Sequence, residues 1–282
     1  MWVILAFGSA FFAGITSILA KMGVADVNST LATALRTIVV LFFSWLMVFI
    51  SGTYVFIDDL KTILFLVLSG ISTGASWLCY FKALQLGDIN KVTPIDKSST
   101  ILTMILAFII FHETISYTKV IGMIIMSMGT YMMITKKNNV QKSQKGWLFY
   151  ALLSAFFASL TAILGKVGVS QINSSLGSAI RTIIVLIMAW LIVFIENKQN
   201  EIKYIDKKNW LFLILSGTTT GASWLCYYKA LQLGPASIVV PIDKLSIVVS
   251  VVFAYFIFHE KLSLKSFTGL IMIVIGTLML LI

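Results

Sequence analysis

Long, nearly unbroken runs of apolar residues restrict the fold of this chain more than any other feature. Residues 39–50, 101–111 and 183–195 are almost entirely apolar, and they extend into longer apolar segments. An α-helix of about 20 residues crosses a hydrocarbon core of about 30 Å. The alternation of polar and apolar residues that marks a membrane β-strand is absent. The sequence therefore predicts an all-α integral membrane protein.

Composition excludes a water-soluble core of this size. The chain is 59% hydrophobic and 11% charged, whereas a soluble domain has about 45–50% apolar and about 25% charged residues. The net charge of +10 lies mostly in short loops between the apolar segments, where basic residues set membrane orientation. We therefore expect a multi-pass protein of the plasma membrane, with the lipid bilayer as its partner and no nucleic acid.

The apolar segments predict ten transmembrane helices, separated by short polar breaks. The helices are expected near residues 2–22, 30–51, 61–86, 90–111, 117–135, 147–167, 174–195, 209–233, 237–258 and 264–282.

The chain contains the same unit twice. Residues 11–21 return as 156–166, a shift of 145 residues, and Gly-Ala-Ser-Trp-Leu-Cys-Tyr at 74–80 returns at 221–227, a shift of 147 residues. The predicted division is a first repeat at 1–137, a linker at 138–146 and a second repeat at 147–282. Because each repeat holds five spans, an odd number, the second must cross the membrane in the opposite sense. Such inverted repeats are a recurrent transporter architecture, with the substrate near the bilayer midplane; a duplicated scaffold without transport is the alternative.

Charged residues within the spans point to a functional site. A charge at the bilayer centre costs about 2.5–3.5 kcal/mol on insertion scales and usually faces a cavity or a partner. Two repeat-related clusters are predicted, each at one depth below its own face of the membrane. They are Arg36, Lys82, Asp96 and Lys97 in the first repeat, and Arg181, Lys229, Asp243 and Lys244 in the second.

We hypothesise that each cluster gates its own side of a central site. Lys82–Asp96 and Lys229–Asp243 would pair in the closed state and separate in the open one, and permanent structural ion pairs are the alternative. Three positive charges against one negative in each cluster favour an anionic or zwitterionic solute, although Arg36 and Arg181 can also serve backbone carbonyls.

Small hydroxyl and aromatic residues lie between the two clusters and suit a cavity for a modest organic molecule. The predicted lining is Thr73, Ser76, Trp77, Tyr80, Thr220, Ser223, Trp224 and Tyr227. Tight helix packing is an equally good reading, because Gly70/Gly74 and Gly217/Gly221 form pairs of small residues. Pro94 and Pro241 are expected to kink their helices and leave polar backbone beside Asp96 and Asp243.

The repeated motifs resemble the EamA-type proteins of the drug/metabolite transporter superfamily over essentially all of both halves. The resemblance rests on Lys21 and Lys166 at the end of the first span of each repeat, and on Arg36 and Arg181 early in the next. It also rests on the aromatic-Lys-Ala-Leu ending of the third span, on Thr93-Pro94 and Pro241, and on Phe-His-Glu at 111–113 and 258–260. The charges at Lys82, Asp96-Lys97 and their repeat mates depart from the family's usual pattern.

The resemblance implies a secondary-active transporter of a small polar metabolite, such as an amino acid or organic anion, with export as the expected direction. A channel or lipid scramblase is the alternative. No catalytic set, metal-ligand cluster, cofactor motif or phosphate loop is present, so an enzyme is not expected. A proton is a candidate coupling ion, and Gly122, Gly129, Gly269 and Gly276 provide either a packing surface or a homodimer surface.

Lysine placement and family resemblance disagree on orientation. Twelve loop lysines fall in the odd-numbered loops and three in the even-numbered loops, so the positive-inside rule places both termini outside the cell. The resemblance places both termini inside. The large lysine bias favours the first orientation.

Overall fold

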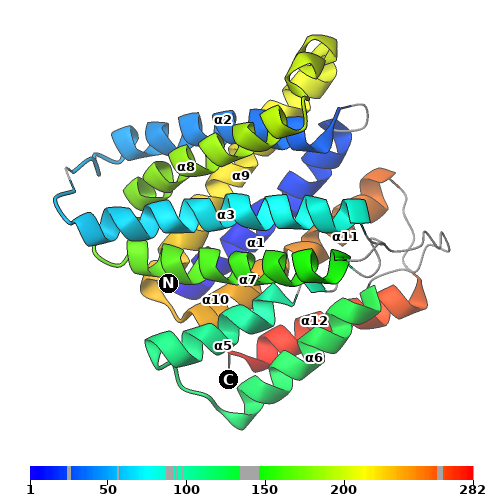
Figure 1. The fold of residues 1–282 in the computed structure, drawn as a ribbon. Coiled ribbons are helices and arrows are strands. Elements are labelled where there is room, and N and C mark those ends of the chain that lie inside the picture. Colours follow the sequence, from blue (N-terminus) through cyan, green and yellow to red (C-terminus); the bar gives the residue numbers. More distant parts are fainter. Residues whose placement is uncertain are drawn as a thin grey trace.

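The computed structural model describes residues 1–23, 27–55, 57–86, 92, 95–96, 98–133, 146–258 and 263–281. These residues form a bundle of α-helices with one short 3-10 helix (Figure 1). The elements are α1 (Trp2–Gly23), α2 (Ser29–Ile50), α3 (Leu60–Leu86), α5 (Ser99–Phe111), α6 (Tyr117–Met133), α7 (Trp147–Gly168), α8 (Ser174–Ile195), η1 (Gln199–Tyr204), α9 (Lys207–Leu233), α10 (Ala236–Lys244), α11 (Ser246–Phe258) and α12 (Leu264–Met279).

Six segments of the described chain are long and apolar enough to cross a bilayer. They are Trp2–Ala20, Ser29–Ile50, Leu60–Tyr80, Trp147–Gly168, Ser174–Ile195 and Ala236–Ile257. Two shorter apolar helices, Ser99–Phe111 and Leu264–Met279, accompany them. Large apolar side chains such as Phe42, Phe49 and Ile195 are exposed on the outside of the bundle, as expected where lipid replaces water. The chain is therefore a multi-pass membrane protein.

The helix starts repeat along the chain as the sequence does. Asn28 accepts hydrogen bonds from the backbone of Thr30 and Leu31 at the start of α2, and Asn173 does the same for Ser175 at the start of α8. Asp206 accepts a hydrogen bond from the backbone of Asn209 at the start of α9. These side chains satisfy amide groups that a helix N-terminus leaves unpaired. They mark where α2, α8 and α9 begin.

The span predicted at 237–258 is broken into α10 and α11. Pro241 lies inside α10, and the break falls at Leu245, directly after Lys244. Proline lacks an N–H and clashes with the turn before it, so its direct effect falls within α10 and not at Leu245. The amide of Leu245 instead donates to the carbonyl of Ile242 at 2.9 Å. The matching Pro94 lies outside the described residues.

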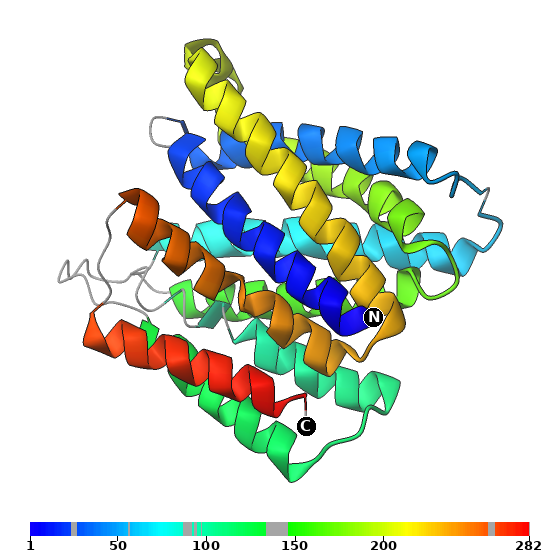
Figure 2. The ribbon, with the colours of Figure 1, turned by 180° about the vertical axis from the view of Figure 1, so that it is seen from behind.

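The two halves of the chain are interlocked. α1 packs along α9 and its repeat mate α7 packs along α3, while α2 lies beside α8 (Figures 1 and 2). α5 packs on α7 and its counterpart α11 packs on α1. The strongest contacts of each half are therefore with the other half.

α6 and α12 pair at one edge of the bundle (Figure 2). A Cβ atom added at Gly129 would lie 2.6 Å from the Gly269 carbonyl oxygen, and one at Gly122 would lie 2.7 Å from the Gly276 carbonyl oxygen. The four glycines predicted as a packing or dimer surface thus bring two helices of the same chain together.

Candidate functional site

A cavity of about 500 Å³ lies between the two halves and collects residues from both. Its volume is in the range of small-molecule sites, about 300–1,000 Å³. Of the residues predicted to bind or gate, those that line it are Ser76, Trp77, Tyr80, Thr220, Trp224, Arg36, Asp96 and Lys244. Aromatic rings, hydroxyl groups, two cations and one carboxylate therefore face one space.

The cavity mixes the two predicted charge clusters. Lys244, predicted to belong with Arg181 near the other face, lines the same cavity as Arg36 and Asp96. The physical reason is its depth: Lys244 is the last residue of α10, well inside the candidate span Ala236–Ile257. It therefore does not lie near one membrane face.

Each arginine binds a threonine from the opposite half. The guanidinium of Arg36 donates from Nη2 to Thr220 Oγ1 at 2.9 Å. Arg181 donates from Nη2 to Thr73 Oγ1 at 2.5 Å, and from Nε to Ser69 Oγ at 2.9 Å. The backbone carbonyls considered as arginine partners do not receive these bonds. Thr73, predicted to line the site, instead holds Arg181.

Each carboxylate is held by a serine of the opposite half. Ser154 Oγ donates to Asp96 Oδ1 at 2.7 Å, and Ser9 Oγ donates to Asp243 Oδ1 at 2.6 Å. A second serine supports each donor, because Ser76 Oγ donates to the Ser154 carbonyl and Ser223 Oγ donates to the Ser9 carbonyl, both at 3.1 Å. Ser223 serves this network and, unlike Ser76, is not among the residues that line the cavity.

The other described residues that were predicted to bind or gate are not among the residues that line the cavity. Lys229 Nζ donates to Gln232 Oε1 at 2.9 Å, and among the described residues it is not within ion-pair distance of Asp243. Tyr227 stacks edge-on with Tyr228, with ring centroids 5.2 Å apart. Lys82 is exposed at the end of α3, and Lys97 lies outside the described residues.

The two halves differ in how open their arginines are. Arg36 lines the cavity, whereas Arg181 is 2% exposed. Rings of Trp224 and Tyr228 lie over the Arg181 guanidinium, with centroids 5.1 Å and 4.9 Å from its Cζ. The repeat-related arginine is thus open to the cavity in the first half and covered in the second.

Several lining residues escaped the sequence prediction. Thr33, Thr37 and Val40 share the cavity-facing side of α2 with Arg36. Their spacing of three or four residues from Arg36 or from one another is the helical signal that could have identified them. Ser9 and Ser154 were also missed, although each stands directly before the repeated Ala-Phe-Phe-Ala sequence.

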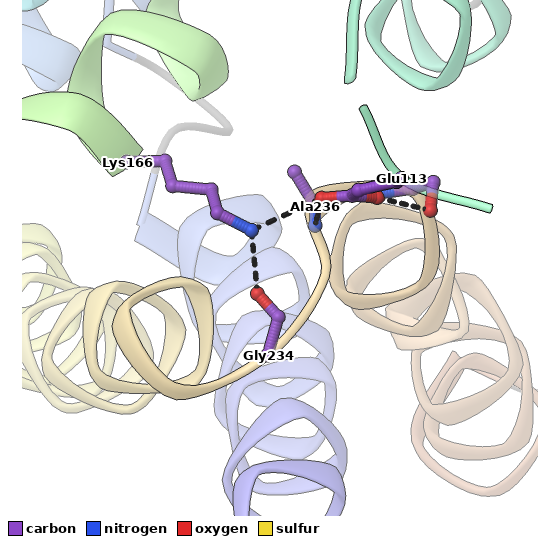
Figure 3. A network of polar contacts seen from close by, with 5 residues as sticks. Glu113, Lys166, Gly234 and Ala236 are labelled. Carbon is purple, nitrogen blue, oxygen red and sulfur yellow. Dashed lines mark hydrogen bonds and ion pairs between the residues drawn. The ribbon is translucent and has the colours of Figure 1, made fainter. Parts of the chain in front are cut away.

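A second polar network surrounds Glu113, two residues after the end of α5 (Figure 3). Glu113 Oε1 accepts hydrogen bonds from Lys166 Nζ at 3.1 Å and from the Ala236 backbone at 2.8 Å. Its Oε2 accepts from the Ser237 backbone at 3.0 Å and from the Ser237 hydroxyl. Lys166 also donates to the Gly234 carbonyl at 2.7 Å (Figure 3). One carboxylate thus caps α10 and joins both halves.

The surroundings of Glu113 favour its charged form. Desolvation raises the pKa of this carboxyl, but the hydrogen bonds from Ser237 and the positive charge of Lys166 outweigh it, so that the pKa lies below its ordinary value. The N-terminal end of α10 adds amide donors that favour a negative charge. The network therefore persists at neutral pH.

A solved crystal structure shares this fold. It aligns with the whole chain and with 98% of its own chain, at a TM-score of 0.79 and 14% sequence identity.

Sequence relatives carry transporter names. The chain is 47% identical over 136 residues to an uncharacterized transporter of Sinorhizobium sp., a match to 48% of this chain and 96% of that protein. It is 23% identical to an uncharacterized transporter of Archaeoglobus fulgidus, over 79% of this chain and 77% of that one. A third relative, the S-adenosylmethionine uptake transporter of Rickettsia bellii, is 26% identical over 69% of this chain and 64% of its own length.

A family model matches almost the whole chain in two segments, residues 1–135 and 145–282, and describes an EamA-like transporter family. Two matches of one model agree with the duplicated unit found in the sequence. A helical membrane bundle with a cavity between its two halves agrees with the same assignment. The chain is a multi-pass membrane protein that belongs to the EamA-like transporter family.

Proposed function

We propose that this transporter is secondary-active and carries a small polar metabolite, an amino acid or another organic anion or zwitterion, by alternating access. The observation that carries the proposal is that the two repeat-related arginines differ in their access to the cavity. Arg36 lines a cavity of about 500 Å³, whereas Arg181 is buried. A carrier that exposes its site to one side at a time requires this kind of inequality between inverted halves.

The proposed topology is ten transmembrane helices in two inverted repeats of five. The interlocked packing supports it, because α1 with α9 and α7 with α3 are repeat-related pairs. The repeated hydrogen bonds of Asp96 with Ser154 and of Asp243 with Ser9 support it too. The N- and C-terminal ends lie at the same end of the bundle (Figure 1), as an even number of crossings requires. In this proposal the first repeat spans residues 1–137 and the second spans residues 147–282.

The cavity charges define the solute class of the proposal. Arg36 and Lys244 provide two positive charges and Asp96 one negative charge. Arginine binds carboxylates through a planar, two-pronged geometry, so we assign the solute's anionic group to Arg36 and Lys244. Trp77, Tyr80 and Trp224 offer aromatic surface to its less polar part.

The Lys229–Asp243 gate that we hypothesise would form in a conformation other than the one described here. Lys229 now binds Gln232, and Asp243 now binds Ser9. A Lys229–Asp243 pair therefore has to exchange these partners when the cavity changes sides. The proposal also includes a proton as coupling ion, bound at Asp96 or Asp243. It includes a homodimer as the oligomeric state.

A channel or lipid scramblase is the second candidate. Polar residues deep in the bundle would suit either of them. The enclosure of Arg181 by Trp224 and Tyr228 favours the carrier, because a continuous pathway does not need a closed end.

Uptake into proteoliposomes tests the function. The panel comprises labelled amino acids, organic acids and S-adenosylmethionine, assayed with and without a pH gradient and in both directions. S-adenosylmethionine is included because a relative is named for its uptake and because it joins an amino-acid group to a planar ring. Saturable uptake stimulated by preloading with the same compound supports a carrier. A linear leak of all compounds supports a channel, and lipid movement without solute transport supports a scramblase.

A further inference from the structure

Arg181 is an enclosed cation with incomplete hydrogen bonding. It is 2% exposed, and its Nε and Nη2 donate to Ser69 and Thr73. Its Nη1 is buried without a hydrogen-bond partner. In the described part of the chain no carboxylate lies within ion-pair distance of it. A buried cation without a carboxylate partner is unfavourable, and the unpartnered Nη1 is a donor that an anion would satisfy.

Trp224 separates Arg181 from the cavity. Its ring lies over the guanidinium, with the centroid 5.1 Å from Cζ, and the same residue lines the cavity. Tyr228 covers the guanidinium at 4.9 Å but is not part of the cavity lining. The cation–π contacts offset part of the cost of enclosure. Trp224 is therefore the residue that contacts both the cavity and Arg181.

The chain uses arginine only at these two matching positions. Of its 21 basic residues, Arg36 and Arg181 are the only arginines and all the others are lysines. Arg36 makes the same kind of bond to Thr220 that Arg181 makes to Thr73, yet Arg36 lines the cavity. Arginine at both positions supplies a planar donor set that fits a carboxylate.

We propose that Arg181 is a second binding position for the anionic group of the transported solute, covered by Trp224 in this conformation. The anionic group binds near Arg36 when the cavity is open as here. It reaches Arg181 when the Trp224 ring leaves the guanidinium and the second half opens. This inference rests on the proposed function, since it assumes that one solute meets both arginines in turn.

Arginine-selective labelling with phenylglyoxal tests the covered site without relying on transport. The full chain is labelled in detergent, and mass spectrometry measures the rate at each arginine. In the unsubstituted protein, Arg181 should react at least about tenfold more slowly than Arg36. In Trp224→Ala, the Arg181 rate should approach that of Arg36. Trp77→Ala is the matched control, because it removes the repeat-related ring and should leave Arg181 slow.

Anion binding is tested with benzoate and with benzyl alcohol, a neutral molecule of similar shape. Benzoate should slow labelling of Arg181 in Trp224→Ala, and benzyl alcohol should not. Trp224→Leu repeats the experiment with more side-chain volume retained, and Arg36 labelling with a monodisperse elution profile confirms a folded variant.

Three results would overturn the inference: equal labelling of both arginines in the unsubstituted protein, a slow Arg181 in both folded Trp224 variants, or no protection by benzoate. Proteoliposome uptake measured in parallel separates the two proposals. Transport combined with any of these three results refutes the covered anion site alone. The expected labelling without transport refutes the carrier and keeps the anion site.

Discussion

At the scale of single residues, the cavity depends on hydroxyl groups that hold charged groups in place. Thr220 fixes one nitrogen of Arg36, and Ser154 fixes one oxygen of Asp96. Both charged groups also line the cavity, where a solute can meet them. A hydrogen bond to a charged group contributes about 1.5–3 kcal/mol. Neutral hydroxyl side chains thus orient the charged side chains of the site.

Arg36→Gln should reduce the uptake rate constant kcat/KM by about tenfold or more, because a bond to a charged group of about 1.5–3 kcal/mol is lost. Arg36→Lys should keep part of the activity, since the charge stays but the planar geometry is lost. Initial uptake rates in proteoliposomes measure both effects. Lys265→Gln, at the exposed start of α12, serves as the charge-loss control. Normal uptake by Arg36→Gln would show that the solute does not use this residue.

Ser9→Ala and Ser154→Ala should each lower the apparent melting temperature of the detergent-solubilised protein. Each substitution removes a hydroxyl that donates to a carboxylate, at a cost of about 1.5–3 kcal/mol. A thermal-shift assay read by size-exclusion chromatography compares them with Ser17→Ala. Ser17 is exposed and its hydroxyl donates to the Ala13 carbonyl of its own helix, so its replacement should have little effect. Unchanged melting of the first two variants would refute this role.

The sequence predicted which residues line the cavity better than it predicted the hydrogen-bond partners of those residues. Eight of the sixteen predicted residues line the cavity, because repeat matching and helix depth identify the region. The roles of Thr73 and Ser223 could not be predicted, since both bind residues about 100 or more positions away, Arg181 and Ser9. Their partners depend on which helices of the two halves meet, and neither periodicity nor composition contains that information.

At the scale of elements, some helix boundaries were predictable and others were not: α5 begins at Ser99, whereas its helix was predicted from residue 90. Apolar segments and asparagine caps limit α2 and α8, which begin within one residue of the predicted positions. The predicted helix at 237–258 is instead two helices, α10 and α11, which meet at Leu245. Proline predicted a kink, but the separation at Leu245 depends on the packing of both pieces.

Glu113→Gln should destabilise the start of α10 by about 1–3 kcal/mol at neutral pH, because the hydrogen bonds from Lys166 and Ser237 lose a charged acceptor. The pKa of Glu113 is lowered from about 4.5, so its stabilising contribution is present above that pH. The contribution is lost as the pH falls through the lowered value. Melting temperatures measured from pH 7 downward should therefore converge for the two proteins only at acidic pH.

The exposed ion pair of Lys198 and Glu201 provides the control for that experiment. Its atoms are 2.7 Å apart, but its side chains are 37% and 40% exposed. Glu201→Gln should leave the melting temperature nearly unchanged, because exposed pairs contribute little. A Glu113→Gln protein that melts like Glu201→Gln would mean that the Glu113 network does not hold the two halves together.

Gly129→Ala should separate α6 from α12. The added Cβ would lie 2.6 Å from the Gly269 carbonyl oxygen, and a backbone atom cannot rotate away as a side chain can. Gly8→Ala is the matched control, since its Cβ would meet only the Cys226 sulfur at 3.7 Å. The first variant should melt several degrees lower and the second should not. Equal melting of the two would contradict the close approach of these helices.

At the scale of the whole molecule, the duplication does not produce two separate domains. Helices of one half complete the packing of the other, and the cavity takes charged residues from both. The repeat in the sequence predicted two matching halves, but it did not predict this exchange. Two side-by-side bundles would satisfy the same repeat.

The orientation of the molecule can be tested at the lysine-rich segment 136–145. The lysine bias predicts that this segment is cytoplasmic and that both termini are outside. Cys79 and Cys226 are replaced by serine, and a cysteine is introduced at Asn139. A membrane-impermeant thiol reagent should label it only after the membrane is opened. Labelling in intact cells would place the segment outside and both termini inside.

The pairing of α1 with α9 has a consequence for biosynthesis. α1 ends at Gly23 and α9 begins at Lys207, so α1 leaves the ribosome long before its neighbour exists. At about 5–20 residues per second, the delay is on the order of ten seconds or more. During that time Ser9 and Thr16 lack the partners on α9 to which they bind in the finished protein, Ser223 and Thr219. The nascent first helix must therefore be held in the membrane by the insertion machinery or by lipid until the second half arrives.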